Sequence, residues 1–381
     1  MAAQRKIETV VDVPQKLQLN QARESTSFTM AQTDWNSMAD SPSDMGVATV
    51  KDAVEILDCT LRDGSYSVDF QFTERTICSV LTALEACGIR FIELGHGLGL
   101  NAAVALVKPT LVADERCFEI AQESLLKADW GMFCIPGIAK KSHLRHAGEN
   151  GMKFVRIGVN ITEVEAASEF VGLAKELGMM AFVNLMKTSL LDGDRITSTV
   201  QKCVTFGADV VYLVDSVGGF LPCEVGDIFA RVGRSVDVPL GFHGHDNMGL
   251  ANANSLAAVS GGATYVDTTL DGIGRGAGNS STEAFAAILR KLGMGSKYDY
   301  ANLAHLSEDE IRPLLRLHDD RFYQLVGALT QTHSSYFPFF RECAAKTNID
   351  VVDLMEAVAE VDRVDPTEEL VMAIAKSLAQ R

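Results

Sequence analysis

The distribution of apolar residues becomes regular at about residue 53, where two patterns begin to alternate. Eight short apolar or β-branched runs predict β-strands: Val54–Cys59, Arg90–Leu94, Trp130–Ile135, Phe154–Val159, Met180–Leu185, Val210–Val214, Leu240–His243 and Thr264–Thr269. Helical spacing follows between them, for example at Glu74–Cys87, Glu163–Leu177, Asp194–Phe206 and Gly249–Ser260. Eight strand–helix units in about 240 residues match the length of a (β/α)8 TIM barrel, the fold that we predict.

Polar residues follow most of the predicted strands, and they distinguish a barrel from the alternative, a doubly wound open sheet. An open sheet would gather its conspicuous residues near one crevice. Here they follow strand after strand: Arg62-Asp63-Gly64, Gly95-His96-Gly97, Pro136-Gly137, Asn160, Asp215-Ser216, His243 with His245, and Asp271–Asn279. Barrel enzymes build their sites from these loops, so we expect acidic, basic and imidazole groups to converge.

The two ends of the chain have different patterns. Residues 1–51 are rich in Gln, Ser, Thr, Asp and Met without a sustained apolar period, which predicts a flexible extension. A partner-binding role is the alternative for this segment. The strand pattern stops after Leu292, and five helices are predicted: Glu308–Leu317, Arg321–Leu329, Phe339–Thr347, Val351–Glu360 and Glu368–Gln380. We therefore expect a barrel over residues 52–293 and a helical domain over residues 294–381 that caps the barrel or docks a partner.

Composition restricts the classes of partner. The 50 acidic and 34 basic residues give a net charge of −16, which argues against nucleic acid or an anionic membrane as the main partner. Small anionic substrates remain possible, because a metal ion and an arginine can reverse the local field. Eight scattered cysteines without a Cys-x-x-Cys pair favour buried thiols in a reducing cytosol. No membrane-spanning run or signal core is evident, so we expect a soluble, cytoplasmic protein.

The sequence His243-Gly244-His245 is the first candidate for chemistry. On a strand, two histidines at a period of two project to the same side and can reach one ion. Such a pair alone is at least as often packed or exposed as metal-bound. Asp63, beside Arg62 at the end of another strand, adds a carboxylate. Two imidazoles and one carboxylate with open positions form a common divalent-metal set.

A glycine-rich loop, Gly272–Asn279, lies between the last predicted strand and a helix that begins near Ser280. Its glycines could let backbone amides approach a phosphate or a carboxylate. As a dinucleotide-binding fingerprint the loop is weak, because it closes the alternating pattern instead of opening it. We interpret it as a tight wall of the site.

Three motifs together carry a family resemblance: Leu57–Gly64 (LDCTLRDG), His243–His245 and Gly272–Glu283. They resemble the metal-dependent pyruvate-aldolase and acyl-CoA lyase/synthase superfamily, which is built on a barrel and includes HMG-CoA lyase-like enzymes. Within it the chain looks most like the 4-hydroxy-2-oxovalerate aldolases. Counterparts also exist for Ile92–Gly97, Ile135–Ile138 and Asp215–Gly219. The resemblance runs from about residue 56 to the C-terminus and is fainter in the helical tail.

The resemblance implies a manganese or magnesium ion with three protein ligands: Asp63, His243 and His245. Asn279 would lie near the ion and is a ligand in some branches. Arg62 would hold the oxygen of the pyruvate enolate, and Ser216 would help to bind the substrate carboxylate. The chemistry agrees, because a 2-oxo acid can chelate the ion while the metal and Arg62 stabilise the negative charge that develops on C–C cleavage.

One position departs from the family pattern. The aldolases have an acid/base histidine three residues after the metal-binding aspartate, and this chain has Tyr66 there. A neutral phenol is a poor base at pH 7. The family also has a tyrosine in a tail segment that resembles Thr332–Ser335, so we hypothesise that Tyr66 and His333 have exchanged identities. The alternative is that His333 is an ordinary interhelical residue.

His96 is a further candidate for substrate contact or proton transfer, because it follows the second predicted strand. Its glycine-flanked setting is equally consistent with hydrogen bonds that only support neighbouring site residues.

The function that the resemblance implies is a class II aldolase, which cleaves or forms a 4-hydroxy-2-oxo acid through a metal-bound pyruvate enolate and releases pyruvate and an aldehyde. In the family the helical tail docks an acylating aldehyde dehydrogenase, and we expect a homo-oligomer. Two alternatives stay open: a Claisen-type acyl-CoA synthase or lyase, and a catalytically altered scaffold subunit suggested by Tyr66 and the extension. The complete set of Arg62, Asp63, His243 and His245 favours an enzyme.

Overall fold

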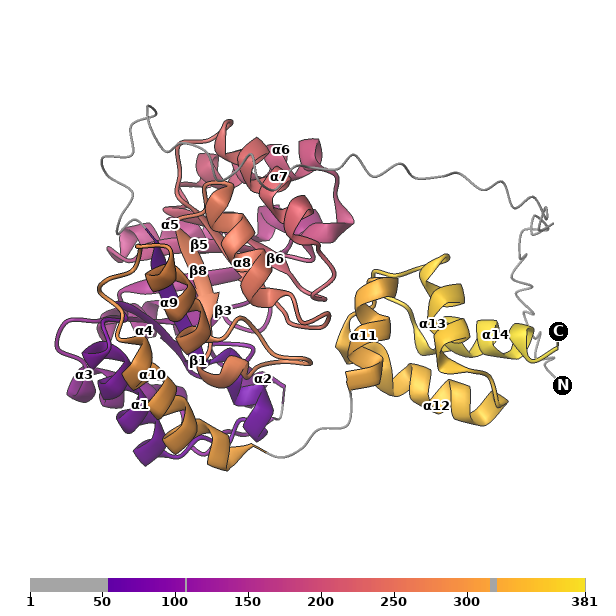
Figure 1. The fold of residues 1–381 in the computed structure, drawn as a ribbon, viewed down its shortest axis with the longest axis horizontal. Helices are drawn as coiled ribbons and strands as arrows, with labels where there is room; N and C mark the ends of the chain where they lie inside the picture. Colours follow the sequence, from indigo (N-terminus) through magenta and orange to yellow (C-terminus); the bar gives the residue numbers. More distant parts are fainter. Residues whose placement is uncertain (1–53, 107, 316–320, 381) are drawn as a thin grey trace, which may run out of the picture. The chain divides into compact units, whose positions relative to one another are not determined.

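The computed structural model describes residues 54–106, 108–315 and 321–380. The predicted extension over residues 1–51 lies outside these ranges. Eight parallel strands pair in sequence order and close into a barrel that helices surround (Figure 1). The strands are β1 (Glu55–Leu61), β2 (Phe91–Leu94), β3 (Asp129–Cys134), β4 (Phe154–Asn160), β5 (Met180–Met186), β6 (Val210–Asp215), β7 (Leu240–Gly244) and β8 (Tyr265–Thr268). Each overlaps one predicted run, so the barrel prediction is confirmed.

The helices that follow the strands are α1 (Glu74–Ala86), α2 (Ala102–Ala105), α3 (Asp114–Ser124), α4 (Lys141–Glu149), α5 (Ser168–Glu176), α6 (Gly193–Phe206), α7 (Pro222–Gly233), α8 (Ala251–Ser260) and, after β8, α9 (Thr282–Lys291). Short 3₁₀ turns occur at η2 (Asp63–Val68), η3 (Ile161–Ala167), η4 (Thr188–Leu190) and η5 (Leu270–Gly272). The predicted helix at Glu163–Leu177 therefore begins as a 3₁₀ turn, with non-helical dihedrals at Glu163. No helix in the described part of the chain is both long and apolar enough to cross a bilayer.

Local signals explain where several helices begin and end. The Thr73 hydroxyl accepts the Thr76 N–H at the start of α1, and Asp192 caps the first turn of α6 in the same way. Helix α6 ends at Gly207, whose φ of 91° is accessible to glycine at little cost. These caps let each helix end within a few residues of the next strand.

The lower half of the barrel interior, toward the N-terminal ends of the strands, is aromatic. Phe91, Phe154, Phe182 and Tyr212 belong to one buried cluster, with Tyr265 packed against it. Gly131 and Gly241 make room for these rings, since a Cβ at either position would come within 2.5 Å of the Phe154 or Tyr212 ring. Two positions farther along their strands, the inward residues are Glu93, Arg156, Asn184 and Asp267, which are buried and polar. The polar site therefore rests on an aromatic layer.

The first elements after the barrel pack onto it. Helix α10 (Tyr300–Leu306), the π turn η6 (Ser307–Ile311) and the 3₁₀ turn η7 (Arg312–Leu314) follow α9, and Leu303 and Ile311 join the barrel core. The prediction of a continuous helix at Glu308–Leu317 is wrong where residues are described. Pro313 lacks an N–H group and its ring clashes with the preceding turn, which is incompatible with a regular α-helix there.

The last four helices enclose a second core. They are α11 (Arg321–Thr330), α12 (Phe337–Thr347), α13 (Val351–Ala359) and α14 (Glu368–Leu378), and η8 (Ser334–Tyr336) precedes α12. Phe340, Leu354 and Val371 are buried in this separate cluster. Each of these helices matches a predicted one within two residues at either end. The predicted boundary between residues 293 and 294 stays a prediction.

Candidate active site

Three potential metal ligands come together at the C-terminal ends of two strands. Asp63 follows β1, His243 lies on β7, and His245 follows β7 directly. Their ligand atoms all lie within 4.8 Å of one another, and all three side chains are buried. Asp63 Oδ2 is 4.0 Å from His243 Nε2. The structure thus brings together the three residues that the sequence predicted as ligands.

Hydrogen bonds orient both imidazole rings. His243 Nδ1 is 2.9 Å from Asp267 Oδ2, and His245 Nδ1 is 3.1 Å from the Gly278 carbonyl oxygen, so both Nδ1 atoms donate. Arg275 Nη2 is 2.8 Å from His245 Nε2. An arginine can only donate, so this Nε2 is an acceptor. A ring that donates through Nδ1 and presents an Nε2 lone pair has the form that binds a metal ion.

The glycine-rich loop after β8 lies against the cluster. Asn279 Nδ2 donates to Asp63 Oδ2 at 2.6 Å, while the buried Asn279 Oδ1 has no hydrogen-bond partner in the described ranges. A Cβ at Gly274 would lie 2.0 Å from Asn279 Nδ2 and 2.9 Å from Asp63 Oδ2, so a side chain there would displace the cluster. A carboxylate, two imidazoles and an orphaned amide oxygen suit a divalent cation.

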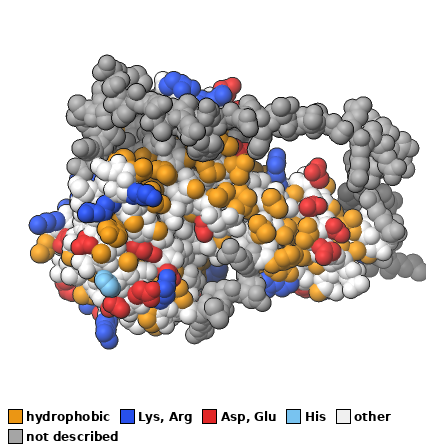
Figure 2. Space-filling model, viewed as in Figure 1, with side chains coloured by type: hydrophobic (Ala, Val, Ile, Leu, Met, Phe, Trp, Pro, Cys, Tyr) orange, Lys and Arg blue, Asp and Glu red, His pale blue; other side chains and the backbone are white. Residues whose placement is uncertain are grey.

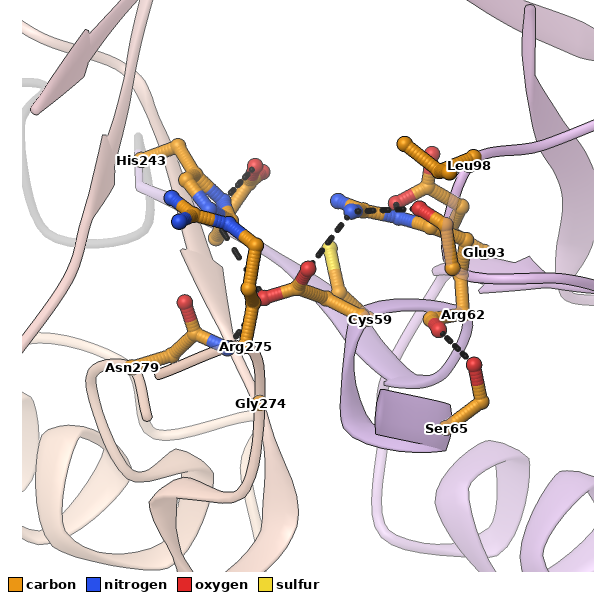
Figure 3. Close-up of polar contacts among 12 residues, drawn as sticks. Cys59, Arg62, Ser65, Glu93, Leu98, His243, Gly274, Arg275 and Asn279 are labelled. Carbon is orange, nitrogen blue, oxygen red and sulfur yellow. Dashed lines mark hydrogen bonds and ion pairs between the residues drawn. The ribbon is translucent and has the colours of Figure 1, made fainter. Parts of the chain in front are cut away.

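Buried ion pairs connect Arg62 to the cluster and to the barrel interior. Arg62 Nη1 donates to Asp63 Oδ1 at 2.9 Å, and Arg62 Nε donates to Glu93 Oε2 at 2.7 Å. Figure 3 shows Arg62 and Glu93 on one side of the site and His243, Arg275 and Asn279 on the other. Arg62 Nη2 has no hydrogen-bond partner among the described residues, so it is available to a substrate.

A second buried arginine completes a chain of charges. Arg156 Nη1 donates to Glu93 Oε2 at 2.8 Å, and Arg156 Nη2 donates to Asp267 Oδ2. Asp267 in turn accepts from His243 Nδ1. The chain therefore runs from Arg62 through Glu93, Arg156 and Asp267 to His243, with each charged group held by its neighbours.

The same contacts set the ionisation of the carboxylates. Burial alone would raise the pKa of Asp63, but Arg62 and the two histidines outweigh it and hold the pKa below its usual range. Burial would also raise the pKa of Asp267, but the neighbouring Arg156 outweighs it and keeps that pKa below its usual value. Both groups are carboxylates at neutral pH and act as acceptors.

A cavity of about 230 Å³ opens at this end of the barrel. Seven residues predicted from the sequence line it: Arg62, Asp63, Tyr66, Ser216, His243, His245 and His333. Ser216 follows β6, and its Oγ accepts the Lys187 N–H at 2.8 Å. Asn279 lies behind Asp63 and is not part of the lining. The residues come from distant parts of the chain, as the barrel fold requires.

Tyr66 and His333 line the same cavity, as the hypothesis of exchanged identities requires. Burial and Asp63 raise the pKa of Tyr66 to about 12, so the phenol stays protonated at neutral pH. The ring packs against Gly97, where a Cβ would lie 2.3 Å from Tyr66 Cε2. Burial lowers the pKa of His333 well below its usual value, and Arg275 and Lys187 lower it further. The imidazole is therefore neutral.

His96 is not brought to the cavity. Its ring stacks on Phe70 with the centroids 4.0 Å apart, and Nδ1 accepts the Leu98 N–H at 3.0 Å. Phe70 in turn contacts the Tyr66 ring at 5.0 Å. The prediction that His96 contacts substrate has no support in this geometry, because the aromatic ring of Phe70 covers it.

Sequence reasoning missed five charged residues of the site or its support. A usable signal existed for three of them, since Glu93, Arg156 and Asp267 each follow an inward aromatic residue by two positions in an apolar strand. Charged residues on the buried face of a strand need partners there. The cavity-lining Arg275 and Lys187 gave no such signal, because both belong to loops.

The fold and this cluster define a barrel enzyme with a divalent-metal type of site at the carboxyl ends of its strands. Comparison with known proteins specifies the family. The HMGL-like family model matches residues 53–309. A 4-hydroxy-2-oxovalerate aldolase from Moorella thermoacetica is 34% identical over 333 residues, which cover 86% of this chain and 98% of the relative. One from Carboxydothermus hydrogenoformans is 33% identical with the same coverage.

Solved structures agree with this relationship. The N-terminal domain of a putative aldolase from Bacteroides vulgatus is 26% identical with a TM-score of 0.60, covering 68% of this chain and 87% of that one. The carboxyl transferase domain of Rhizobium etli pyruvate carboxylase, at 16% identity and a TM-score of 0.69, covers 86% and 60% and shows the fold alone. The chain belongs to the HMGL-like family, and within it to the aldolase branch of the carbon–carbon lyases. The resemblance inferred from the motifs is confirmed.

Proposed function

We propose that this protein is a divalent-metal-dependent class II aldolase that cleaves, or in reverse forms, a 4-hydroxy-2-oxo acid to give pyruvate and an aldehyde. The observation that carries the proposal is the cluster of Asp63, His243 and His245 beside Arg62 in one cavity. The relatives named 4-hydroxy-2-oxovalerate aldolase support the same reaction. A volume of about 230 Å³ suits a small 2-oxo acid better than a bulky acyl-CoA.

Manganese or magnesium would be held by Asp63, His243 and His245. Asn279 would join the ligands after its amide turns, because Nδ2 and not Oδ1 faces Asp63 in this structure. The ion would supply Lewis acidity toward a ketone and its carboxylate. The protein's part is to fix the donor atoms: Asp267 and the Gly278 carbonyl oxygen orient the two imidazoles. These outer contacts raise the basicity of the ligands and keep the donor set rigid.

Arg62 would stabilise the negative charge that develops on the pyruvate oxygen. Its Nε and Nη1 are held by Glu93 and Asp63, so Nη2 can point at a substrate without a large loss of side-chain entropy. Ser216 would bind the substrate carboxylate from the loop after β6. Such prearranged donors act mainly on the transition state, where the charge is greatest.

Proton transfer at the 4-hydroxyl would involve Tyr66 and His333. In the cleavage direction, His333 would accept the hydroxyl proton on Nδ1 after releasing the Ser335 N–H, which Nδ1 accepts at 3.2 Å. The protonated phenol of Tyr66 would orient the hydroxyl group. His96 would act only by holding Phe70 and, through it, the Tyr66 ring. This assignment exchanges the residue types of the related aldolases but keeps one acid/base group and one donor.

The direct test measures pyruvate release with a lactate dehydrogenase coupled assay. Chelator-stripped protein is mixed with 4-hydroxy-2-oxopentanoate or longer homologues, without metal and then with manganese or magnesium. We expect release that requires metal and disappears in Asp63→Ala. Metal binding without pyruvate release from any homologue, together with free CoA release from acetyl-CoA and a 2-oxo acid, would instead favour the Claisen-type synthase.

The C-terminal helices would dock an acylating aldehyde dehydrogenase that consumes the aldehyde, and the protein would form a homo-oligomer. An apolar stripe on α11 supports a docking role: Phe322, Leu325 and Leu329 are 52%, 48% and 71% exposed. Figure 2 shows apolar side chains at the surface of the tail. Light scattering of Leu329→Glu, alone and with a candidate dehydrogenase, would show whether the stripe binds a second copy or the dehydrogenase.

We also propose a cytoplasmic location. All eight cysteines fall in the described part of the chain, and all are free thiols. Free, mostly buried thiols are typical of a reducing compartment.

A further inference from the structure

We infer that the preferred substrate carries a second carboxylate, on the fragment released as the aldehyde, and that Arg275 and Lys187 bind it. The inference rests on the proposed aldolase function and specifies its substrate class. Such a substrate differs from one that releases a neutral aldehyde such as acetaldehyde. The evidence lies in the hydrogen bonds and charges on the cavity wall.

Arg275 is a cation whose protein partners are neutral. The side chain comes from the loop after β8 and lines the cavity. Its Nη1 donates to Ser334 Oγ at 2.7 Å, and its Nη2 donates to the Ser216 carbonyl oxygen at 2.7 Å and to His245 Nε2 at 2.8 Å. Guanidinium groups in proteins remain charged, and no carboxylate of the described residues forms a direct ion pair with this one, although Asp63 acts on it at longer range.

The other arginines near the site are compensated. Arg62 pairs with Asp63 and Glu93, and Arg156 pairs with Glu93 and Asp267. Arg312 flanks the same loop from outside and pairs with Asp271 and Glu308. A partly buried cation with only neutral partners costs free energy unless a ligand supplies the negative charge.

Lys187 adds a second such cation to the cavity. It precedes η4 with a left-handed φ of 58°, and its side chain lines the same cavity. Its Nζ donates to the Val364 carbonyl oxygen at 3.1 Å, which is again a neutral acceptor. Both Lys187 and Arg275 lower the pKa of His333, so the two cations act on the same side chain. His333 is the group that we assign to the 4-hydroxyl, beside the fragment that leaves.

The charge balance of the filled site points the same way. The carboxylates of Asp63, Glu93 and Asp267 offset the guanidinium groups of Arg62 and Arg156 and leave one negative charge. A divalent ion then leaves one positive charge, which the carboxylate of the pyruvate fragment balances. Arg275 and Lys187 bring two more positive charges, which a neutral aldehyde fragment cannot balance. A terminal carboxylate reduces this excess.

Metal binding would also free the arginine for such a ligand. His245 Nε2 cannot hold the ion and accept from Arg275 at the same time, because it has one lone pair. With His245 Nε2 holding an ion, Arg275 Nη2 would lose this acceptor and keep only the Ser216 carbonyl oxygen. The released N–H groups can form a bidentate pair with a carboxylate, which is the geometry that arginine favours.

The test compares two ligands that differ only at one end. 2-Oxoglutarate and 2-oxopentanoate have the same five-carbon chain and 2-oxo acid head, but the first ends in a carboxylate and the second in a methyl group. Neither has a 4-hydroxyl, so the aldolase reaction cannot consume them. Binding to the manganese-loaded full chain is measured by titration calorimetry, and pyruvate release is measured separately with 4-hydroxy-2-oxoglutarate and 4-hydroxy-2-oxopentanoate.

We expect the unaltered protein to bind 2-oxoglutarate at least about tenfold more tightly than 2-oxopentanoate. Arg275→Gln should raise the Kd of 2-oxoglutarate by about tenfold to a hundredfold. The Kd of 2-oxopentanoate should change by less than about threefold. Arg275→Lys should restore part of the loss, and Lys187→Gln should give the same selective loss in smaller degree. The matched control is Arg312→Gln, which removes a cation beside the same loop but outside the cavity and should leave both ligands unchanged.

Four outcomes would overturn the inference. Equal binding of the two ligands by the unaltered protein would show that no second carboxylate is recognised. Equal weakening of both ligands in Arg275→Gln would assign the arginine to the pyruvate head instead. Metal-independent binding of both ligands, with no pyruvate released from either hydroxy acid, would remove the aldolase proposal and this inference with it. Metal-dependent release from both hydroxy acids at equal kcat/KM would contradict only the inference.

Discussion

The two halves of the barrel interior are built from the same strands but from opposite kinds of side chain. Phe91, Phe154 and Tyr265 fill the lower half, with ring centroids such as those of Phe91 and Phe154 lying 5.6 Å apart. Two residues farther along β2, β4 and β8, the inward positions are Glu93, Arg156 and Asp267. One step of the strand period thus changes the interior from a packed aromatic layer to a chain of charges.

The difference shows how the barrel separates stability from chemistry. Apolar packing tolerates substitutions of similar volume at a modest cost in stability, so the lower half can absorb small changes of shape. The charged half depends on every partner, because each missing group leaves a buried charge uncompensated. Changes in the lower half should therefore alter stability alone, whereas changes in the upper half should alter activity or both.

The largest expected effect is on the metal cluster itself. Asp63→Asn keeps the shape of the side chain but removes the charge that would hold the ion and Arg62. We expect kcat/KM for pyruvate release to fall by about a thousandfold or more, with the fold retained by circular dichroism. Asp129→Asn, at the opposite end of β3, is the control and should change kcat/KM by less than about twofold. A loss below tenfold in Asp63→Asn would remove the distinction between the halves.

Arg156→Met should show how strongly the charged half depends on one partner. The substitution leaves Glu93 and Asp267 buried without their shared cation. We expect the free energy of unfolding of the metal-free protein to fall by about 3 to 5 kcal/mol in urea titrations. The matched control, Arg90→Met, removes a largely exposed arginine that lies 3.4 Å from Asp129 and should cost less than about 1 kcal/mol. Similar costs for the two variants would contradict the proposed interdependence.

Tyr66→Phe tests the rim of the charged half without removing a charge. The pKa of Tyr66 is raised to about 12, so the phenol is protonated across the ordinary working range and acts as a donor. We expect kcat/KM to fall by about tenfold to a hundredfold, and the factor should be the same at pH 7 and at pH 9. A loss that grew as the pH rose from 7 to 9 would instead indicate a phenolate base with a low pKa.

Phe154→Leu should have the smallest effect and should fall on stability alone. The variant opens a small space between the Phe91 and Phe182 rings but leaves the metal cluster in place. We expect unfolding to become easier by about 1 to 2 kcal/mol. The kcat/KM of the folded protein should stay within about twofold. A large loss of activity at unchanged stability would show that the aromatic layer positions the site more directly than its contacts indicate.

Much of the barrel could be predicted because each strand is a short apolar run bounded by polar residues and a helix. The predicted helix at Glu163–Leu177 was only partly right, since tertiary packing imposes a 3₁₀ turn on residues 161–167 that apolar spacing does not reveal. Helices after Leu315 were predictable from their spacing. The break at Pro313 could also have been predicted, because a proline inside a helical pattern interrupts the helix. The π turn before it could not, because apolar spacing carries no information on backbone hydrogen bonding.

The site was predictable only where a motif carried it. Asp63, His243 and His245 meet as their local patterns and the family resemblance indicated. Arg275 could not be foreseen, because the path of a loop with left-handed glycines decides where its side chain goes. The surroundings of His96 could not be foreseen for a similar reason: Phe70, in a left-handed conformation with φ of 63°, stacks on its ring. Both depend on tertiary geometry.

One measurement tests directly whether the charged half performs metal-dependent pyruvate chemistry. Chelator-stripped protein is incubated with pyruvate in D₂O, and deuterium incorporation at C3 is followed by mass spectrometry after quenching. We predict exchange that requires added manganese or magnesium, persists in Phe154→Leu and disappears in Asp63→Asn. Exchange at the same rate without metal, or its absence with either ion bound, would contradict the assignment of Asp63, His243 and His245 to an enolate-forming metal site.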